Sequence, residues 1–142
     1  MNAPVALAKT DVDRVVRPPV LSVRGLRTEF VGRGGTTTAV DGLSYDVRPG
    51  EIVALVGESG SGKSAHARSV MRLLPPSGRV VGGEVLYGDV DLLTLSERRM
   101  RKIRGAEVGM VFQDPMTSLN PVLTIGRQVT ETFHAHEDIG RQ

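Results

Sequence analysis

The 142-residue sequence contains no cysteine and no tryptophan, and only 4% of its residues are aromatic. Without cysteine, neither a disulfide framework nor a thiolate metal site can form. No window approaches the roughly 18 apolar residues of a membrane-spanning helix, and residues 1–19 lack the apolar core of an export signal. Eighteen Lys/Arg against sixteen Asp/Glu give no general argument for nucleic acid or an anionic membrane as a partner.

What the sequence does contain is 39% hydrophobic residues, enough for the core of one globular domain. Residues 1–19 mix alanine, proline and charge without periodicity, and we interpret them as a flexible leader. From residue 20 onward, apolar segments of strand and helix length alternate and are separated by glycine and proline. We therefore expect residues 20–142 to belong to one α/β domain.

Two strands are predicted before residue 50. Residues 21–24 indicate the first, with Leu26 and Phe30 as a candidate extension, and a loop rich in glycine and threonine follows. Residues 40–47 indicate the second, because Leu43, Tyr45 and Val47 alternate with polar residues. Alternation of this kind is typical of a strand with one face in water.

The segment from residue 51 to residue 64 has the pattern of a strand, a tight loop and a helix. Residues 52–56 are all apolar, which suits a parallel strand buried on both faces. Three glycines then allow a sharp bend and a close backbone approach to a ligand. Helical spacing begins at Gly62 and continues to Leu74, where two prolines end it.

This loop matches the phosphate-binding template Gly-x-x-x-x-Gly-Lys-Ser at every defined position. Backbone N–H groups at a helix N-terminus, with the positive end of the helix dipole, favour an anion. On the template, Lys63 reaches the β- and γ-phosphates and the Ser64 hydroxyl binds Mg²⁺. The alternative is a linker that merely joins strand to helix. The predicted binding residues are Gly57, Glu58, Ser59, Gly60, Ser61, Gly62, Lys63 and Ser64.

Four further elements are predicted downstream. Residues 83–87 form a short strand, and the capping-box spacing at residues 94–97 opens a helix that ends near Gly105. Residues 108–112 are an apolar run of strand length, and residues 125–134 indicate a last helix. The middle helix carries five basic residues, but no aromatics are interleaved with them, so a solvated basic face is favoured over nucleic-acid binding.

Residues 108–115, Val-Gly-Met-Val-Phe-Gln-Asp-Pro, resemble the Q-loop of ABC-transporter ATPases. The continuation at residues 116–121, with residues 92–97 and 102–105 upstream, is similar to the oligopeptide, dipeptide and nickel importer branch. The resemblance covers about residues 21–129. It implies an α/β fold with a P-loop NTPase (ABC ATPase) core and a small antiparallel β-layer.

The resemblance also implies roles for individual residues. Gln113 would be the Q-loop glutamine, contacting Mg²⁺ and the attacking water, and would act with Lys63 in catalysis. An amide suits this task because it offers both an oxygen to the metal and an N–H₂ to phosphate. The Mg²⁺ ligands would be Ser64 and Gln113. Phe30 lies where the family stacks an aromatic ring on adenine, with Val40 against the base edge, although Phe30 could equally be a core residue of the β-layer.

A protein of this family would be the ATP-binding subunit of an importer that takes up peptides or similar small solutes by binding and hydrolysing MgATP. Its implied partners are transmembrane permease subunits, a second ATPase subunit and, indirectly, a solute-binding protein, with no nucleic acid. It would lie in the cytoplasm, on the inner face of the cell membrane, attached through the permease. Neither the solute nor the choice between homodimer and heterodimer follows from the sequence.

The family's Leu-Ser-Gly-Gly-Gln signature, the Walker B strand that ends in Asp-Glu, and the switch histidine do not occur in these 142 residues. We therefore expect an N-terminal portion of the ATPase, truncated before the signature motif, with the helical subdomain starting in residues 121–142. This portion is expected to bind ATP without turnover. The alternative is a natural short form, a non-catalytic nucleotide-binding module, and a P-loop kinase is a more distant possibility.

Overall fold

The computed structural model describes residues 6–9, 17–113 and 119–136. The chain divides into two compact units, Met1–Thr94 and Leu95–Gln142. In the described part of the chain, no helix combines the length and the apolar character needed to cross a membrane.

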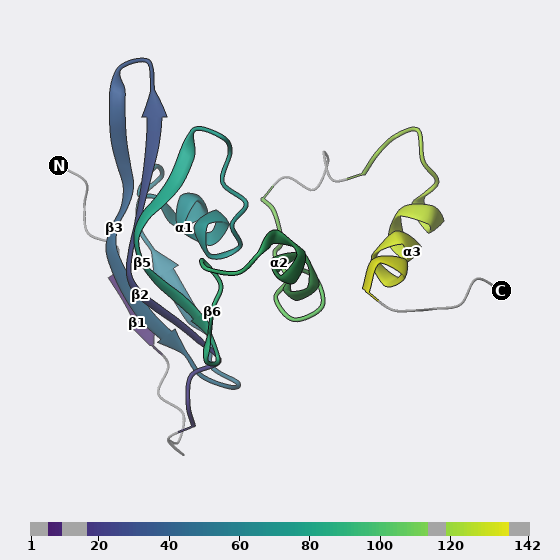
Figure 1. Ribbon diagram of the computed structural model, residues 1–142, viewed down its shortest axis with the longest axis horizontal. Helices are drawn as coiled ribbons and strands as arrows, with labels where there is room; N and C mark the ends of the chain where they lie inside the picture. The colour runs from purple at the N-terminus through teal and green to yellow at the C-terminus, as the bar shows by residue number, and fades with distance from the viewer. Residues whose placement is uncertain (1–5, 10–16, 114–118, 137–142) are drawn as a thin grey trace. The chain divides into compact units, whose positions relative to one another are not determined.

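The first unit is built on a four-stranded antiparallel sheet with the order β3-β2-β5-β6 (Figure 1). Its strands are β2 (Leu21–Gly32), β3 (Gly35–Val47), β5 (Gly78–Tyr87) and β6 (Val90–Asp91). The long strand β2 pairs with β3 on one side and with β5 on the other, so it is the centre of the sheet. This sheet confirms the predicted antiparallel β-layer.

The strands of this sheet are longer than the sequence pattern indicated. β3 begins at Gly35, not at Val40, so the predicted loop is reduced to a tight turn between paired Gly32 and Gly35. Thr36, Thr37 and Thr38 belong to the strand because β-branched side chains fit a pleated surface. β5 likewise starts at Gly78, five residues before the predicted start.

The strand before the glycine loop, β4 (Val53–Val56), belongs to a separate two-stranded sheet. Its partner is β1 (Ala6–Lys9), in antiparallel register. The expectation of a parallel strand buried on both faces is wrong, since Ile52 is 80% exposed and Val56 is 56% exposed. β1 lies within the residues interpreted as a flexible leader. An unpaired strand edge pairs readily with any extended segment, which explains how these residues become a strand.

Helix α1 (Lys63–Val70) follows the glycine loop and contacts β2, β3 and β5. It ends four residues earlier than predicted, because Arg72 adopts a left-handed conformation with φ 52°. Leu73 then donates its N–H to Arg68 and Arg72 donates to Ser69, the paired bonds of a Schellman motif.

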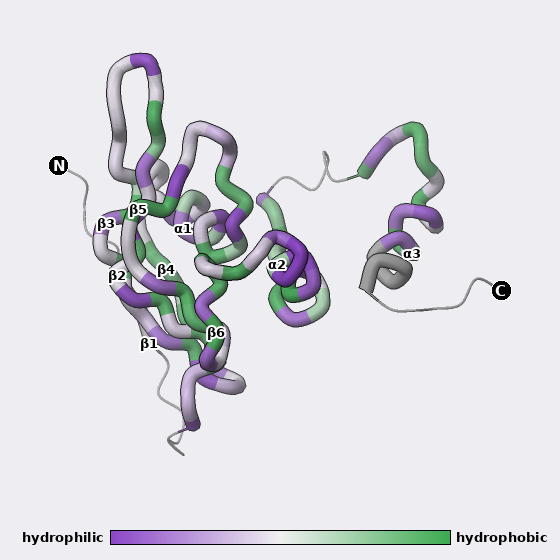
Figure 2. The backbone as a smooth tube through the Cα atoms, in the orientation of Figure 1, coloured by the Kyte–Doolittle hydropathy of each residue, from purple (hydrophilic) through white to green (hydrophobic). Residues whose placement is uncertain are grey.

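The core of the first unit lies between α1 and the sheet. Figure 2 shows hydrophobic and hydrophilic positions alternating along the strands, as expected when only one face is covered. The buried apolar side chains of this unit are Val23, Leu26, Val40, Val70, Met71, Val85 and Leu92.

The second unit contains α2 (Glu97–Ile103) and α3 (Ile125–His136). Ser96, not Thr94, is the N-cap of α2, and its side chain accepts a hydrogen bond from the backbone of Arg99. The basic side chains of this helix at positions 98, 99, 101 and 102 are exposed, whereas Met100 is fully buried. A solvated basic face is therefore what α2 presents.

The predicted strand at residues 108–112 is wrong. Val108 makes an isolated bridge to Arg104, and the following residues form no strand. Val111 is 96% exposed and Phe112 is 47% exposed. An apolar run becomes a strand only where a neighbour satisfies its backbone, and none of the described strands pairs with this segment.

Candidate functional site

Residues 57–62 connect β4 to α1, and Lys63 and Ser64 begin the helix, so the predicted order of strand, loop and helix is confirmed. Within the loop, the N–H of Ser61 donates to the carbonyl of Glu58 at 3.2 Å. Gly60 and Gly62 have φ values of 83° and 92°, in the left-handed region that glycine adopts without strain. Gly62 is the N-cap residue of α1.

Gly62 is required by space as well as by its backbone angles. A β-carbon at this position would overlap the backbone carbonyl of Ala39, a residue of β3. It would also lie 3.8 Å from Val40. The start of α1 is therefore seated directly on the backbone of β3, and Val40 lies beside the loop.

The N-terminus of α1 is suited to an anion. Gly62 supplies no side-chain cap, and no acidic residue lies in the first turn. The amides of Lys63, Ser64 and Ala65 have no acceptor within the helix, and they carry the positive end of its dipole. Ser64 is exposed, so its hydroxyl is accessible beside these amides. Together these groups form a cluster of hydrogen-bond donors at the start of α1.

The ammonium group of Lys63 is held inside the loop. Its Nζ donates to the carbonyl of Gly57 at 2.7 Å, to that of Glu58 at 2.6 Å and to the Ser61 hydroxyl at 3.1 Å. The side chain thus folds back across the residues that precede it. This contact places one positive charge next to the loop amides, where an anionic group would meet both.

Behind the loop, His66 of α1 contacts Tyr45 of β3. The Tyr45 hydroxyl lies 2.9 Å from His66 Nε2, and the two rings are tilted at 58° with centroids 5.3 Å apart. Burial lowers the pKa of His66 to about 4 and raises the pKa of Tyr45 to about 12. Both side chains are therefore neutral near pH 7. The sequence analysis missed this pair, and its one signal was the helical spacing of His66 ahead of Val70.

Phe30 lies near the end of β2, and its ring covers Gly78 on the paired strand β5. A β-carbon at Gly78 would lie 2.8 Å from Phe30 Cε1. The ring is half-buried, so one part of it packs in the sheet while another faces solvent. Its role in stacking on adenine stays a prediction.

Gln113 lies in the second unit and is exposed. Residues 114–118, which follow it, are outside the described part of the chain. Its predicted contacts with Mg²⁺ and water stay predictions. Among the described residues, no group of three or more His, Asp or Glu side chains could hold a metal ion. The predicted roles of Ser64 and Gln113 as Mg²⁺ ligands stay predictions.

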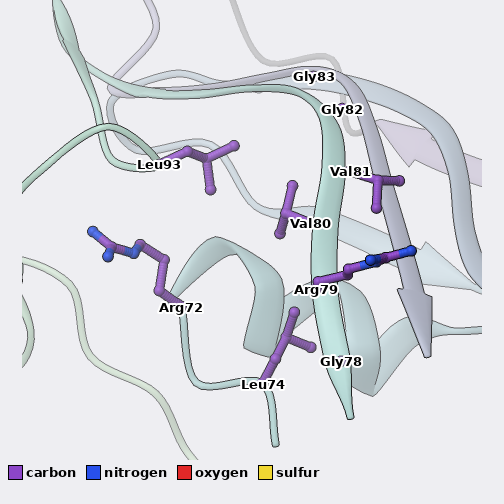
Figure 3. Close-up of a pocket in the computed structure, with 9 residues that line it drawn as sticks. All are labelled: Arg72, Leu74, Gly78, Arg79, Val80, Val81, Gly82, Gly83 and Leu93. Carbon is purple, nitrogen blue, oxygen red and sulfur yellow. The ribbon is translucent and has the colours of Figure 1, made fainter. Parts of the chain in front are cut away.

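A separate hollow of about 510 Å³ lies between the segment that follows α1 and strand β5 (Figure 3). Leu74, Val80 and Leu93 face it, and Arg72 stands at its side with Nη1 donating to the carbonyl of Leu92 at 3.3 Å. None of the residues that line it belongs to the glycine loop. This hollow is therefore not part of the candidate phosphate site.

The loop and its helix define a P-loop NTPase, and comparison with known proteins gives the family. The sequence model described as "ABC transporter" matches residues 40–141. Because the match covers well over half of the sequence, the chain belongs to the ABC transporter family. The predicted fold class, an ABC ATPase core with a small antiparallel sheet, is confirmed by this match.

Several relatives are similar over most of the chain. The peptidoglycan transport ATP-binding protein YejF of Agrobacterium fabrum is 52% identical over 122 residues, which are 85% of this chain and 22% of that protein. The dipeptide transport ATP-binding protein DppD of Bacillus subtilis is 49% identical over 124 residues, 87% of this chain and 37% of that protein. The oligopeptide transport ATP-binding protein OppD of the same organism is 45% identical over 130 residues, 91% of this chain and 36% of that protein. The chain thus spans between about a fifth and two fifths of these relatives' length.

Proposed function

We propose that residues 57–64 bind the phosphates of MgATP, and that the chain is the nucleotide-binding part of a subunit that energises import of peptides or similar solutes. The observation that carries this proposal is the ammonium group of Lys63, held within the loop at the start of α1. A single positive charge beside unpaired helix amides is the arrangement that polyphosphate requires.

Each group in the loop has a distinct task in this proposal. The amides of residues 59–64 donate to the α- and β-phosphates, and Lys63 exchanges its loop carbonyls for β- and γ-phosphate oxygens. The exposed Ser64 hydroxyl and the amide of Gln113 are the protein ligands of Mg²⁺. Two neutral ligands fit this ion, which keeps several waters and takes its remaining oxygens from the nucleotide. When bound, Mg²⁺ neutralises charge on the phosphates.

We further propose that the 142 residues bind ATP but turn it over negligibly. Phosphoryl transfer depends on a placed water and on electrostatic stabilisation. Gln113 can orient that water. The 142 residues contain no strand ending in Asp-Glu, whose glutamate would polarise the water. The second candidate function is a nucleotide-binding module without catalysis, which would use the same phosphate-binding loop. Turnover assigned to these residues would contradict both.

The relatives' names support the proposed setting. Those proteins are called dipeptide and oligopeptide transport ATP-binding proteins. For this chain we propose, by likeness to them, transmembrane permease subunits and a second ATPase subunit as direct partners, and a solute-binding protein as an indirect one. The proposed location is the cytoplasm, on the inner face of the cell membrane.

Titration of the purified chain with MgATP tests the proposal, with Lys63→Ala and Ser59→Ala as a matched pair. Loss of Lys63 removes charge-assisted hydrogen bonds, so we expect about a 10- to 100-fold weaker affinity. Ser59 contributes through its backbone, so its variant should bind as the unmodified chain does. Ser64→Ala should reduce the gain in affinity that Mg²⁺ gives over Mg²⁺-free ATP. Equal binding by the unmodified chain and Lys63→Ala would overturn the phosphate site.

A further inference from the structure

The face of α1 that is turned to the sheet is unusually polar. Gly62, His66 and Ser69 are spaced at i, i+4 and i+7, so they lie on one side of the helix. His66 is 5% exposed and Ser69 is 0% exposed. Each of the three meets the sheet, Gly62 through its α-carbon and the other two through hydrogen bonds.

The two hydrogen bonds come from different strands. Tyr45 of β3 lies 2.9 Å from His66 Nε2, and Thr28 of β2 lies 2.8 Å from the Ser69 hydroxyl. Ser69 already donates its one proton to the carbonyl of Ala65 at 2.7 Å. Thr28, which is 0% exposed, is therefore the donor to Ser69. Two adjacent strands thus each hold one point of α1.

Hydrogen bonds constrain a helix differently from apolar contacts. Apolar burial is non-directional, whereas a hydrogen bond requires a defined distance and angle between two particular atoms. A shift of α1 by one residue moves the helix about 1.5 Å along its axis. This would break both hydrogen bonds and leave buried polar groups unpaired. The two bonds therefore fix the rotation and the axial position of α1 together.

Lys63 and Ser64 lie on the first turn of the same helix. They are three and two residues before His66, at the end of α1 that continues into the glycine loop. The contacts that fix the rotation and axial position of α1 therefore also fix the positions of Ser64 and of the first-turn amides. Binding of Mg²⁺ and phosphate depends on the positions of these groups to within about 0.5 Å.

We propose that Tyr45 and Thr28 are positioning residues for nucleotide binding, and that they act through His66 and Ser69 to hold the phosphate-binding turn in its register. The proposal rests on the proposed function, since it concerns the same site. In this proposal, neither Tyr45 nor Thr28 contacts the nucleotide. Their effect is on the geometry of Lys63 and Ser64.

The experiment measures affinity for MgATP and for Mg²⁺-free ATP, together with thermal unfolding, in three variants of the purified chain. Thr28→Val removes the hydroxyl at nearly constant shape, and Thr28→Ser keeps the hydroxyl. Tyr45→Phe keeps the ring and is the milder change, because Tyr45 is only partly buried. All titrations are made at temperatures where every variant compared is fully folded.

We expect Thr28→Val and Tyr45→Phe to weaken MgATP binding by about 2- to 10-fold each, the effect of one lost hydrogen bond. The loss should be larger for MgATP than for Mg²⁺-free ATP, and Thr28→Ser should restore wild-type affinity. Lower melting temperatures with unchanged MgATP affinity would assign both residues a merely structural role and overturn the proposal. Failure of the proposed function is distinct, since the unmodified chain itself would then not bind MgATP.

Discussion

The backbone carbonyl of Ala39 lies against the α-carbon of Gly62, with no room between them for a side chain. β3 and the start of α1 therefore touch through backbone alone. Gly60, two residues earlier, has a similar φ of 83°, but no atom lies within 4 Å of where its β-carbon would be. The two loop glycines are thus constrained differently, one by contact and by angle and the other by angle only.

Alanine substitutions at Gly60 and Gly62 should separate the energetic cost of contact with Ala39 from the cost of backbone strain. Gly60→Ala should destabilise the chain by about 1–2 kcal/mol, the cost of a left-handed non-glycine residue. Gly62→Ala adds overlap with a backbone that cannot rotate away, so we expect a loss of 3 kcal/mol or more, on the order of the largest single-residue effects. Urea denaturation measures both. Equal losses would show that the contact with Ala39 is unimportant.

The glycine loop could be predicted because its requirements are local. Glycines at positions 57, 60 and 62, a lysine and a serine at fixed spacing define the bend, and the helix begins beside them. The alternation at residues 40–47 likewise predicted a strand with one face in water. The antiparallel β-layer itself was implied by the family resemblance. The starts of β3 and β5 were misplaced, and the short strand β6 was not predicted.

The errors concern pairing between distant segments. β4 pairs with β1, more than 40 residues away, and no pattern in either segment specifies that partner. The apolar run at residues 108–112 has strand composition but no partner among the described strands. The contact of His66 with Tyr45 likewise depends on how α1 crosses the sheet. Secondary-structure propensity is a property of a single segment, whereas strand pairing and the contact of His66 with Tyr45 each depend on two segments.

Stability should fall in mild acid because of His66. Burial lowers its pKa to about 4, against 6.5 for an exposed histidine. Between these values the unfolded chain binds a proton that the folded chain does not, so stability is complete above about pH 6.5 and declines as the pH falls toward 4. The contribution is at most about 3 kcal/mol. Urea denaturation at several pH values across this window measures it.

Carboxylates also titrate in this range, so the histidine is isolated by comparison with His66→Gln. Glutamine stays neutral and can still hydrogen-bond to Tyr45. We expect the free energy of unfolding of the unmodified chain to fall more steeply below pH 6.5 than that of this variant. Parallel curves would contradict a buried neutral His66.

Arg72 adopts a backbone conformation that favours glycine. It is the only non-glycine residue with positive φ among the described residues, and it stands at the position of a Schellman motif where glycine is preferred. Arg72→Gly and Arg72→Ala both remove the side chain that donates to Leu92, so their difference reports the backbone alone. We expect the glycine variant to be more stable than the alanine variant by about 1 kcal/mol. Thermal unfolding measures this difference, and equal stabilities would mean that Arg72 is unstrained.

Phe30 can be tested for two roles at once, packing over Gly78 and stacking on adenine. Phe30→Leu keeps an apolar side chain against the sheet but removes the aromatic face, whereas Phe30→Tyr keeps both. Stacking of a base on an aromatic ring contributes about 1–3 kcal/mol, so Phe30→Leu should weaken ATP binding by about 5-fold or more. Its affinity for inorganic tripolyphosphate, which has no base, should not change. If both ligands lose affinity equally, or neither does, the ring is a packing residue of the β-layer and the adenine lies elsewhere.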